Sequence, residues 1–282
     1  MKQSWNDRLF RAREVMDTAQ SIVIGGGAGL SNAAGLVYDG PRFTGNFSDF
    51  IDRYDMKDMY SATFYPFETE EGRWAYWARH IGINRYDPPA AELYKKLKQL
   101  VKGKLHFVLT TNVDHQFHKA GFPEEAVFAV QGDYGFLQCA KGCHETLYDN
   151  EQLISEMRAA TTYCKIPFSL IPRCPVCGGR MDINIRKGNY FVEDVKWRQA
   201  AGRHTAFVQM AREKRMVLLE LGVGFNTPGI IRYPFEQLAY ACPDATIIRI
   251  NRDFPEGARE NKKRTIAFEE DMTEVIHELL SQ

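Results

Sequence analysis

The most constraining feature of this sequence is a glycine-rich stretch between residues 21 and 43, SIVIGGGAGLSNAAGLVYDGPRF. Its start, Ser21–Ile24, is mostly apolar and β-branched and predicts a short buried strand. Glycines follow at positions 25, 26, 27 and 29, where the missing side chains let a backbone approach a ligand. The segment from Leu30 to Gly35 predicts the first turn of a helix, with Ser31 or Asn32 as its N-cap. Strand, loop and helix N-terminus together favour an anion, and the pyrophosphate of a dinucleotide is the natural ligand.

This loop departs from the usual dinucleotide fingerprint in two respects. Leu30 occupies the place of the third glycine, and after Gly35 the chain enters a loop broken by proline and glycine instead of a second strand. A tight strand-to-helix turn that binds nothing is therefore the alternative interpretation. Motifs further along the chain have to decide between the two.

Charge and hydropathy exclude several classes of function. Lys and Arg together number 36, as do Asp and Glu, so the net charge is zero and no basic field attracts nucleic acid. The longest apolar run, Met216–Phe225, is interrupted by Glu220 and two glycines and is too short to span a bilayer. The N-terminus, MKQSWNDRLFRARE, has no apolar signal-peptide core. We expect a soluble, cytoplasmic protein that binds neither membrane nor nucleic acid.

Four of the six cysteines form two close pairs, and these predict a metal site. The pairs are Cys139 with Cys143, and Cys174 with Cys177. In a cytoplasmic chain such spacing indicates a tetrahedral, structural zinc site rather than disulfides. Reduced, buried cysteines are the alternative, which suits Cys164 and Cys242 better. His144 is a less favoured replacement for one of the cysteine ligands.

Apolar runs that predict strands alternate with segments of helical periodicity. Strands are expected at 21–24, 107–109, 126–130, 216–221 and 245–250, and helices at 5–18, 90–101, 196–214 and 272–280. This alternation predicts an α/β fold with a Rossmann-type, doubly wound parallel sheet. We expect one domain over residues 1–282, with a Rossmann lobe at about 1–45, 85–135 and 195–282. An aromatic-rich helical insertion of about 46–84 would cover the cofactor, and a small zinc-binding lobe would span about 136–194.

Polar residues or glycines follow nearly every predicted strand. The segments are Thr110–Asp114, Gln131–Gly132, Gly222–Gly224 and Asn251–Asp253. An open parallel sheet binds its ligand at the carboxyl ends of its strands, so these segments are candidates for one site.

Taken in order along nearly the whole chain, these motifs resemble the sirtuins. The similarity is carried by Gly27–Ser31, Thr110–Asp114 with Ala120–Gly121, the two cysteine pairs, Gly222–Gly224 and Ile250–Asn251. Sirtuins are NAD-consuming enzymes with a Rossmann lobe and a small zinc-bearing lobe, so the resemblance implies NAD as co-substrate and structural zinc. The implied cofactor-binding residues are Gly27, Ala28, Gly29, Ser31, Asp39, Arg42, Phe43, Thr111, Asn112, Asp114, Gln131, Gly222, Gly224, Asn251 and Arg252.

The sequence also departs from the sirtuin deacylases. Their general base is the histidine of a His-Gly pair after the third strand, and this chain has Gln131 there. Asp39 and Arg42 are the nearest counterparts of an aspartate and an arginine in the family's cofactor loop. Arg186 stands where the family has an apolar residue, and the Gly-Thr-Ser motif loses both hydroxyls at Val223 and Gly224.

This set of changes resembles class M, the sirtuins linked to macrodomain proteins. That class consists of protein ADP-ribosyltransferases whose known target is a lipoylated glycine-cleavage H-like carrier protein. The resemblance implies the same acceptor here and a macrodomain protein that reverses the modification.

Physical chemistry favours transfer over deacylation. Cleavage of nicotinamide from NAD needs positioning more than a base. Asn112 is suited to hold the ribose hydroxyls, and Asp114 to accept a hydrogen bond from the nicotinamide carboxamide. Deacylation needs a base, which an amide such as Gln131 cannot supply near neutral pH. We expect Gln131 to orient the acceptor, and an unpaired Arg186 to engage a carboxylate on the acceptor or the lipoyl group.

Two other interpretations remain open at this level. One is an NAD-dependent lysine deacylase with an atypical active site, and the other is an NAD-binding sensor without catalysis. The presence of Asn112 and Asp114 argues against the sensor. His115 and His118 follow that motif, but we expect them on an exposed helix face rather than as substitute bases.

Overall fold

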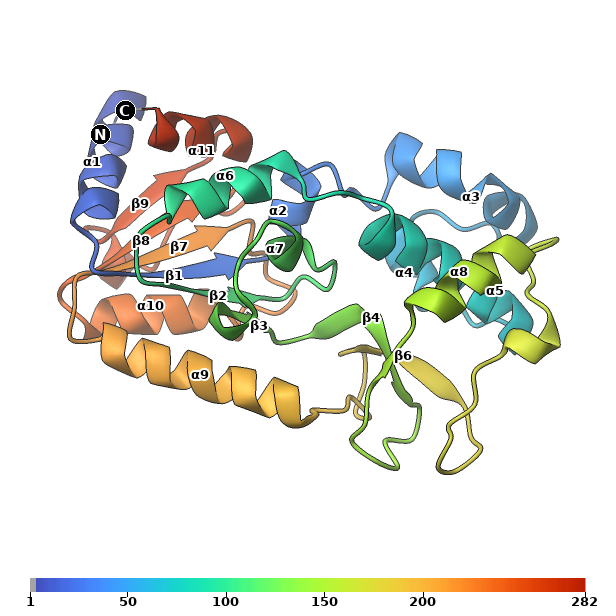
Figure 1. Cartoon of the computed structure of the whole chain (residues 1–282). Helices are drawn as coiled ribbons and strands as arrows, with labels where there is room; N and C mark the ends of the chain where they lie inside the picture. The colour runs from blue at the N-terminus through green and yellow to red at the C-terminus, as the bar shows by residue number, and fades with distance from the viewer. Residues whose placement is uncertain (1–3, 282) are drawn as a thin grey trace.

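The computed structural model describes residues 4–281 and is built on a six-stranded parallel sheet (Figure 1). Its strand order is β3-β2-β1-β7-β8-β9. The bounds are β1 Ser21–Gly26, β2 His106–Thr110, β3 Val127–Ala129, β7 Met216–Leu221, β8 Ala245–Ile250 and β9 Thr265–Phe268. The chain builds outward from β1 in one direction and then returns to build in the other. This reversal of strand order is where doubly wound sheets bind their ligands.

Helices cover both faces of this sheet, as expected for the Rossmann lobe. Ile22 and Ile24 point to one face, where they join a core with α1, α6 and α11, whereas Val23 joins a core with α9 and α10 on the other. Such runs, apolar on both sides, are typical of buried parallel strands. The helices are α1 Trp5–Thr18, α6 Glu92–Leu100, α9 Val195–Ala211, α10 Arg232–Ala241 and α11 Met272–Leu280. Helix α10 and the short edge strand β9 were not predicted from the sequence.

The small lobe combines the helical insertion with the cysteine-bearing segment. Its antiparallel sheet has the order β5-β4-β6, with β4 Gly132–Cys139, β5 Tyr148–Asp149 and β6 Met181–Ile185. Its helices are α3 Gly40–Tyr54, α4 Met59–Ala62, α5 Glu70–Ile81 and α8 Glu151–Ala160. One continuous apolar core runs from Phe43 through Trp74 and Trp77 to Ile183. The insertion and the zinc lobe, expected as separate units, thus share a core, and the helical part begins at Gly40 rather than near residue 46.

Short elements complete the fold. They are α2 Ala28–Ala33, the π-helical η1 Gly82–Tyr86, α7 Gln116–Lys119, and the 3-10 turns η2 Glu124–Ala126, η3 Phe168–Leu170 and η4 Arg259–Asn261. In the insertion, Tyr60 and Phe64 are exposed, and the buried rings are Phe47, Phe50, Trp74, Tyr76 and Trp77.

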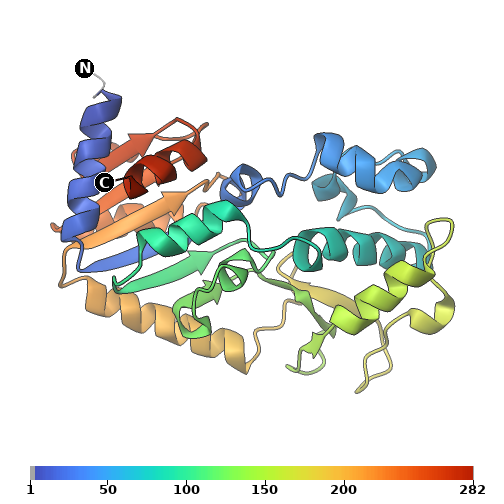
Figure 2. The ribbon, with the colours of Figure 1, turned by 45° about the horizontal axis from the view of Figure 1, so that its top comes forward.

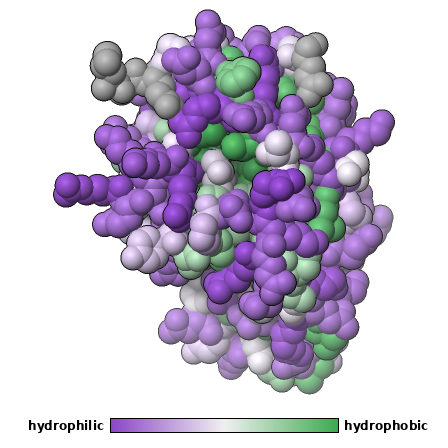
Figure 3. Space-filling model, turned by 90° about the vertical axis from the view of Figure 1, so that its left-hand side faces the viewer, coloured by the Kyte–Doolittle hydropathy of each residue, from purple (hydrophilic) through white to green (hydrophobic). Residues whose placement is uncertain are grey.

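The first and last helices, α1 and α11, pack against each other at the end of the large lobe that lies away from the small lobe (Figures 1 and 2). Figure 3 views that end directly and shows a mainly hydrophilic surface. Within residues 4–281, no helix has both the length and the apolar character that a bilayer crossing requires.

Candidate active site

The carboxyl ends of β1, β2 and β7 point toward the small lobe, so the polar segments that follow them meet between the two lobes (Figure 1). The polar segments after the strands predicted a site at this edge of the sheet. The structure adds the contacts that hold the segments in place.

The glycine loop after β1 is interlocked with the loop after β7. The Gly29 N–H donates to the Gly222 carbonyl at 2.9 Å, and Gly222 has a positive φ of +61°. A Cβ on Gly27 or Gly29 would lie 2.7 Å from the backbone of Gly222. These glycines are therefore needed for contact between two loops, a reason the sequence analysis did not give.

The prediction that Ser31 or Asn32 caps the helix after this loop is wrong. Helix α2 begins at Ala28, its N-cap is Gly27, and neither Ser31 nor Asn32 caps it, because both lie within the helix. Ser31 instead turns its hydroxyl toward the end of β2, where it donates to Asp114.

Ser31, Asn112, Asp114 and Tyr94 form one buried network. The Ser31 hydroxyl lies 2.5 Å from Asp114 Oδ2 and 3.0 Å from the Tyr94 hydroxyl. The Asn112 amide donates to the Gly27 carbonyl at 2.9 Å and to the Tyr94 hydroxyl at 3.3 Å. Burial raises the pKa of Asp114, against the hydrogen bonds from Ser31 and the Gln116 backbone. The structure thus joins three predicted site residues and adds Tyr94 from α6.

Gln131 and Arg186 are neighbours through the backbone. The Arg186 N–H donates to the Gln131 carbonyl at 2.9 Å, which ties the end of β6 to the connection between β3 and β4. The expectation that Arg186 is unpaired is wrong. Its guanidinium contacts Glu193 at 2.5 Å and lies over the rings of Phe191 at 4.3 Å and Trp197 at 5.7 Å. Phe191 and Glu193 lie in the loop between β6 and α9, and Trp197 lies in the first turn of α9.

Two predicted residues in the first turn of α3 lie in or beside the small-lobe core. The Arg42 guanidinium donates to the Val37 carbonyl at 2.7 Å and to Asn84 Oδ1 at 2.9 Å. Phe43 is buried against Phe47 with ring centroids 5.4 Å apart, whereas Asp39 is exposed at the N-terminus of α3. In this structure these residues are not part of the Asp114 network.

The remaining predicted cofactor residues lie around the strand ends. The Thr111 N–H donates to the Gly26 carbonyl at 3.0 Å, and buried Asn251 donates to the Val223 carbonyl at 2.8 Å. Arg252 is exposed and pairs with Asp253. Ala28 and Gly224 are exposed at the loops after β1 and β7.

A charged cluster beside the network was not predicted from the sequence. Asp133 accepts from Arg85 Nε at 2.7 Å and lies 2.6 Å from His115 Nδ1. The His115 ring stacks on His118 at 4.1 Å, and His118 pairs with Glu124 at 3.0 Å. Burial acts to raise the pKa of Asp133, but its histidine and arginine partners outweigh burial and lower that pKa to about 2.

The expectation that His115 and His118 lie on an exposed helix face is wrong. Both side chains are largely buried, with 26% and 17% of their surfaces exposed. His115 also has a positive φ of 63°, a left-handed conformation that a non-glycine residue adopts at a cost. Its contact with Asp133 holds it there. The sequence signal that pointed to His115 was its position directly after the Asn112–Asp114 motif.

The four paired cysteines converge as predicted. Their sulfur atoms all lie within 4.8 Å of one another, with Cys139 and Cys177 at 3.7 Å and Cys143 and Cys174 at 3.6 Å. Tetrahedral zinc with bonds of ~2.3 Å separates its sulfur ligands by about 3.8 Å, so the cluster fits a zinc ion. His144 Nδ1 lies 3.1 Å from the Cys143 sulfur, while its Nε2 contacts the Tyr148 hydroxyl at 2.8 Å. The site can therefore be closed by four cysteines with His144 beside them.

Solved structures of sirtuins have this fold. A Sir2 homolog in complex with NAD matches with a TM-score of 0.60 and 17% sequence identity, covering 96% of this chain and 92% of that one. The chain therefore has the two-lobed, Rossmann-type fold of the sirtuins. No protein-family model matches the chain.

Similarity to characterised sequences identifies the family. A protein ADP-ribosyltransferase of Staphylococcus aureus (strain Mu50 / ATCC 700699) is 36% identical over 265 residues, covering 94% of this chain and 84% of that protein. A probable bifunctional ADP-ribose hydrolase/ADP-ribosyltransferase of Fusarium oxysporum f. sp. cubense is 33% identical over 246 residues, or 82% of this chain and 40% of the fungal protein. The chain belongs to the sirtuin family, and these relatives carry the name of ADP-ribosyltransferases.

Proposed function

We propose that this chain transfers ADP-ribose from NAD to a lipoylated, glycine-cleavage H-like carrier protein and releases nicotinamide. The observation that carries the transferase activity is the buried network of Ser31, Asn112 and Asp114, with Gln131 just after β3, the strand that pairs with β2. It combines residues suited to nicotinamide cleavage with an amide in place of the deacylase base. The bacterial relative's name supports the same reaction.

The residues present suit NAD as the co-substrate. Asp114 offers a buried carboxylate that can accept a hydrogen bond from a carboxamide, and Asn112 offers an amide for the ribose hydroxyls. A Cβ on Gly224 would meet no atom within 4 Å, so the loop after β7 leaves open space at the strand ends. We assign the nicotinamide half of NAD to the Asp114 side of this edge.

In the transfer, the bond between ribose C1′ and the nicotinamide nitrogen breaks, and its electron pair leaves with nicotinamide. A lone pair on the acceptor forms the new bond to C1′, and the acceptor's proton passes to solvent. Asn112 and Asp114 hold the reacting groups in place, which is the main requirement of such a step. Gln131 can orient the acceptor by hydrogen bonding but cannot take a proton near neutral pH.

The carrier is the finer part of the proposal. It rests on the resemblance to class M, together with the exchange of the deacylase histidine for Gln131. The fungal relative's name joins ADP-ribose hydrolase to ADP-ribosyltransferase in one protein. This pairing supports the further proposal that a separate macrodomain protein removes the modification made here, in the cytoplasm.

Intact mass spectrometry tests this proposal directly. The enzyme is incubated with NAD, the lipoylated H-like protein and an acetyl-lysine peptide in the same tube. An ADP-ribose added to the carrier, with the peptide unchanged, supports the proposed function. The unlipoylated carrier serves as the control, and equal modification of both forms would exclude the lipoyl group as a determinant.

One observation favours a second candidate, NAD-dependent deacylation. In the Asp133–His115 pair a carboxylate can orient a histidine as a base. His115 directly follows Asp114 in the sequence. Loss of acetyl from the peptide, abolished in His115→Asn, would establish this activity. Deacetylation that first appears in Gln131→His, at the expense of transfer, would instead confirm that Gln131 selects transfer.

A further inference from the structure

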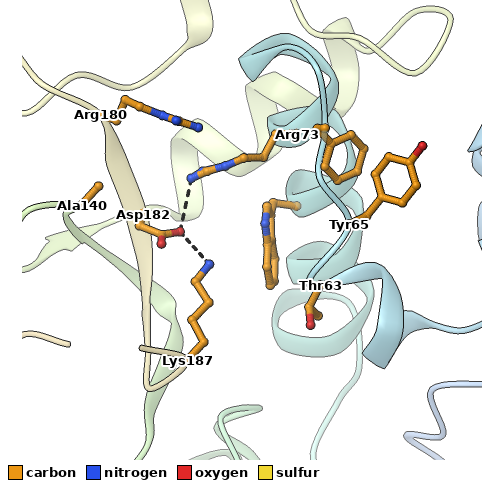
Figure 4. Close-up of a pocket in the computed structure, with 9 residues that line it drawn as sticks. Thr63, Tyr65, Arg73, Ala140, Arg180, Asp182 and Lys187 are labelled. Carbon is orange, nitrogen blue, oxygen red and sulfur yellow. Dashed lines mark hydrogen bonds and ion pairs between the residues drawn. The ribbon is translucent and has the colours of Figure 1, made fainter. Parts of the chain in front are cut away.

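A cavity in the small lobe lies between the α4–α5 segment and strand β6 (Figure 4). Its volume is about 270 Å³, enough for a small organic group. It is lined by Thr63, Tyr65, Phe67, Arg73, Trp77, Ala140, Arg180, Asp182 and Lys187. None of these residues belongs to the Asp114 network.

Positive charge predominates in this small-lobe cavity. Three cations and one carboxylate line it, and that carboxylate, Asp182, is shared between Arg73 at 3.2 Å and Lys187 at 2.8 Å. Arg180 extends to Glu70, outside the lining, and its side chain is 59% exposed. Nη1 of Arg73 is buried without a hydrogen-bond partner in the described part of the chain. Arg73 Nε also lies 3.7 Å from Glu70, so the three cations face two carboxylates, Asp182 and Glu70, and the remaining positive charge can attract an anion.

Aromatic rings form the apolar part of the same wall. The Lys187 ammonium lies 4.9 Å from the centroid of the Trp77 ring, and Tyr65 and Phe67 also line the cavity. Burial lowers the pKa of Lys187, against the attraction of Asp182. Cations beside apolar walls suit a carboxylate on a short aliphatic stem better than a fully hydrated inorganic ion.

The small-lobe cavity is connected to the transfer site through two consecutive residues. The Arg186 backbone bonds to the Gln131 carbonyl, and its side chain packs on Phe191 and Trp197. The next side chain, Lys187, points the other way, to Asp182 and Trp77. Lys187, which lines the cavity, thus follows directly in sequence the residue that is hydrogen-bonded to Gln131.

We propose that the small-lobe cavity binds the carboxylate of an acidic side chain on the acceptor protein and so positions the acceptor for transfer. The proposal rests on the transferase function proposed above. Binding of a carboxylate in the cavity can be tested without that function, because a small free carboxylate should occupy the cavity in the absence of NAD and acceptor.

The first experiment tests carboxylate binding without NAD or acceptor. Trace labelling of lysines with an amine-reactive reagent, read by mass spectrometry, is compared with and without glutarate as the probe. Glutarate is expected to slow labelling of Lys187 several-fold, to leave Lys57 unchanged, and to lose its effect in Arg180→Gln. Glutaramide, its neutral analogue, is the control. Equal protection by glutaramide, or none by glutarate, would overturn the proposal.

The second experiment identifies the occupant by transfer kinetics with the lipoylated carrier. Lys187→Met removes the ammonium but leaves Asp182 paired with Arg73, so the fold is expected to survive. Loss of one charged hydrogen bond should raise the KM for the carrier about tenfold, with a much smaller effect on kcat. Lys187→Arg should bring the KM for the carrier most of the way back to the wild-type value. Lys57 forms an exposed pair with Asp55 and serves as the control, so Lys57→Met should have the wild-type KM.

The outcomes separate this proposal from the proposed function. If the wild type modifies the carrier and Lys187→Met has an unchanged KM, the acceptor does not use the cavity and the proposal fails. If the wild type does not modify the carrier at all, the proposed acceptor is wrong and the assigned occupant falls with it. In that event the glutarate experiment still decides whether the cavity binds carboxylates.

Discussion

Substitution of Gly222 by alanine should separate the two loops that form the floor of the site. Gly222 has a φ of +61°, and a Cβ there would lie 2.4 Å from the Gly29 carbonyl carbon and from the Leu30 nitrogen. The left-handed conformation costs an alanine ~1–2 kcal/mol. Forcing a methyl group against fixed backbone adds ~1–3 kcal/mol. We therefore expect Gly222→Ala to lose about 2–5 kcal/mol of unfolding free energy.

Gly224→Ala is the matched control, two residues further along the same loop. Its φ is not in the left-handed range, and a Cβ there would meet nothing within 4 Å. Such a substitution should be neutral or stabilise by up to ~1 kcal/mol, because alanine restricts the unfolded chain. The measurements are urea unfolding and the KM for NAD, which should rise at least about tenfold in Gly222→Ala. If the two variants unfold at the same urea concentration, the inferred clash between a Cβ at position 222 and the glycine loop is wrong.

Three further predictions follow from the other clusters. Asp114→Asn should lower nicotinamide release about 100-fold while leaving the fold intact; an unchanged rate would remove this carboxylate from the reaction. Cys174→Ser, or chelation of zinc, should cost the small lobe on the order of 10 kcal/mol and abolish its near-UV circular dichroism; a retained signal would contradict a structural zinc. Asp133 should stabilise the folded state by about 2 kcal/mol at neutral pH, since its pKa falls from 3.8 to about 2. This contribution is fully present above about pH 4 and is lost as the pH falls toward 2, so the gap in unfolding free energy between wild type and Asp133→Asn should shrink over that range.

The parts of the fold that depend on local sequence could be predicted. The run Ser21–Ile24 and the glycines after it specify β1 and its loop, and the cysteine spacings specify the metal cluster. Strand β9 was missed because it has only four residues and follows a basic run. It becomes a strand by pairing with β8, a contact that no local pattern shows.

The same distinction applies to the candidate site. Asn112 and Asp114 lie in a recognisable motif, whereas Tyr94 comes from a helix with no motif of its own and meets them only through the fold. Ser31 was expected as a cap because serine commonly caps helices, but its distant partner Asp114 determines its role. Arg186 was expected to be free because Glu193 reaches it only through the path of a loop.

The packing of α1 against α11 has a practical consequence for how this enzyme can be linked to other molecules. Both helices lie at the end of the large lobe that faces away from the small lobe and the strand ends (Figures 1 and 2). A fluorophore, an affinity handle or a whole second domain fused before α1 or after α11 would extend away from the carboxyl ends of the strands. Two successive enzymes of one modification cycle could thus be joined in a single polypeptide without blocking the candidate active site of this one.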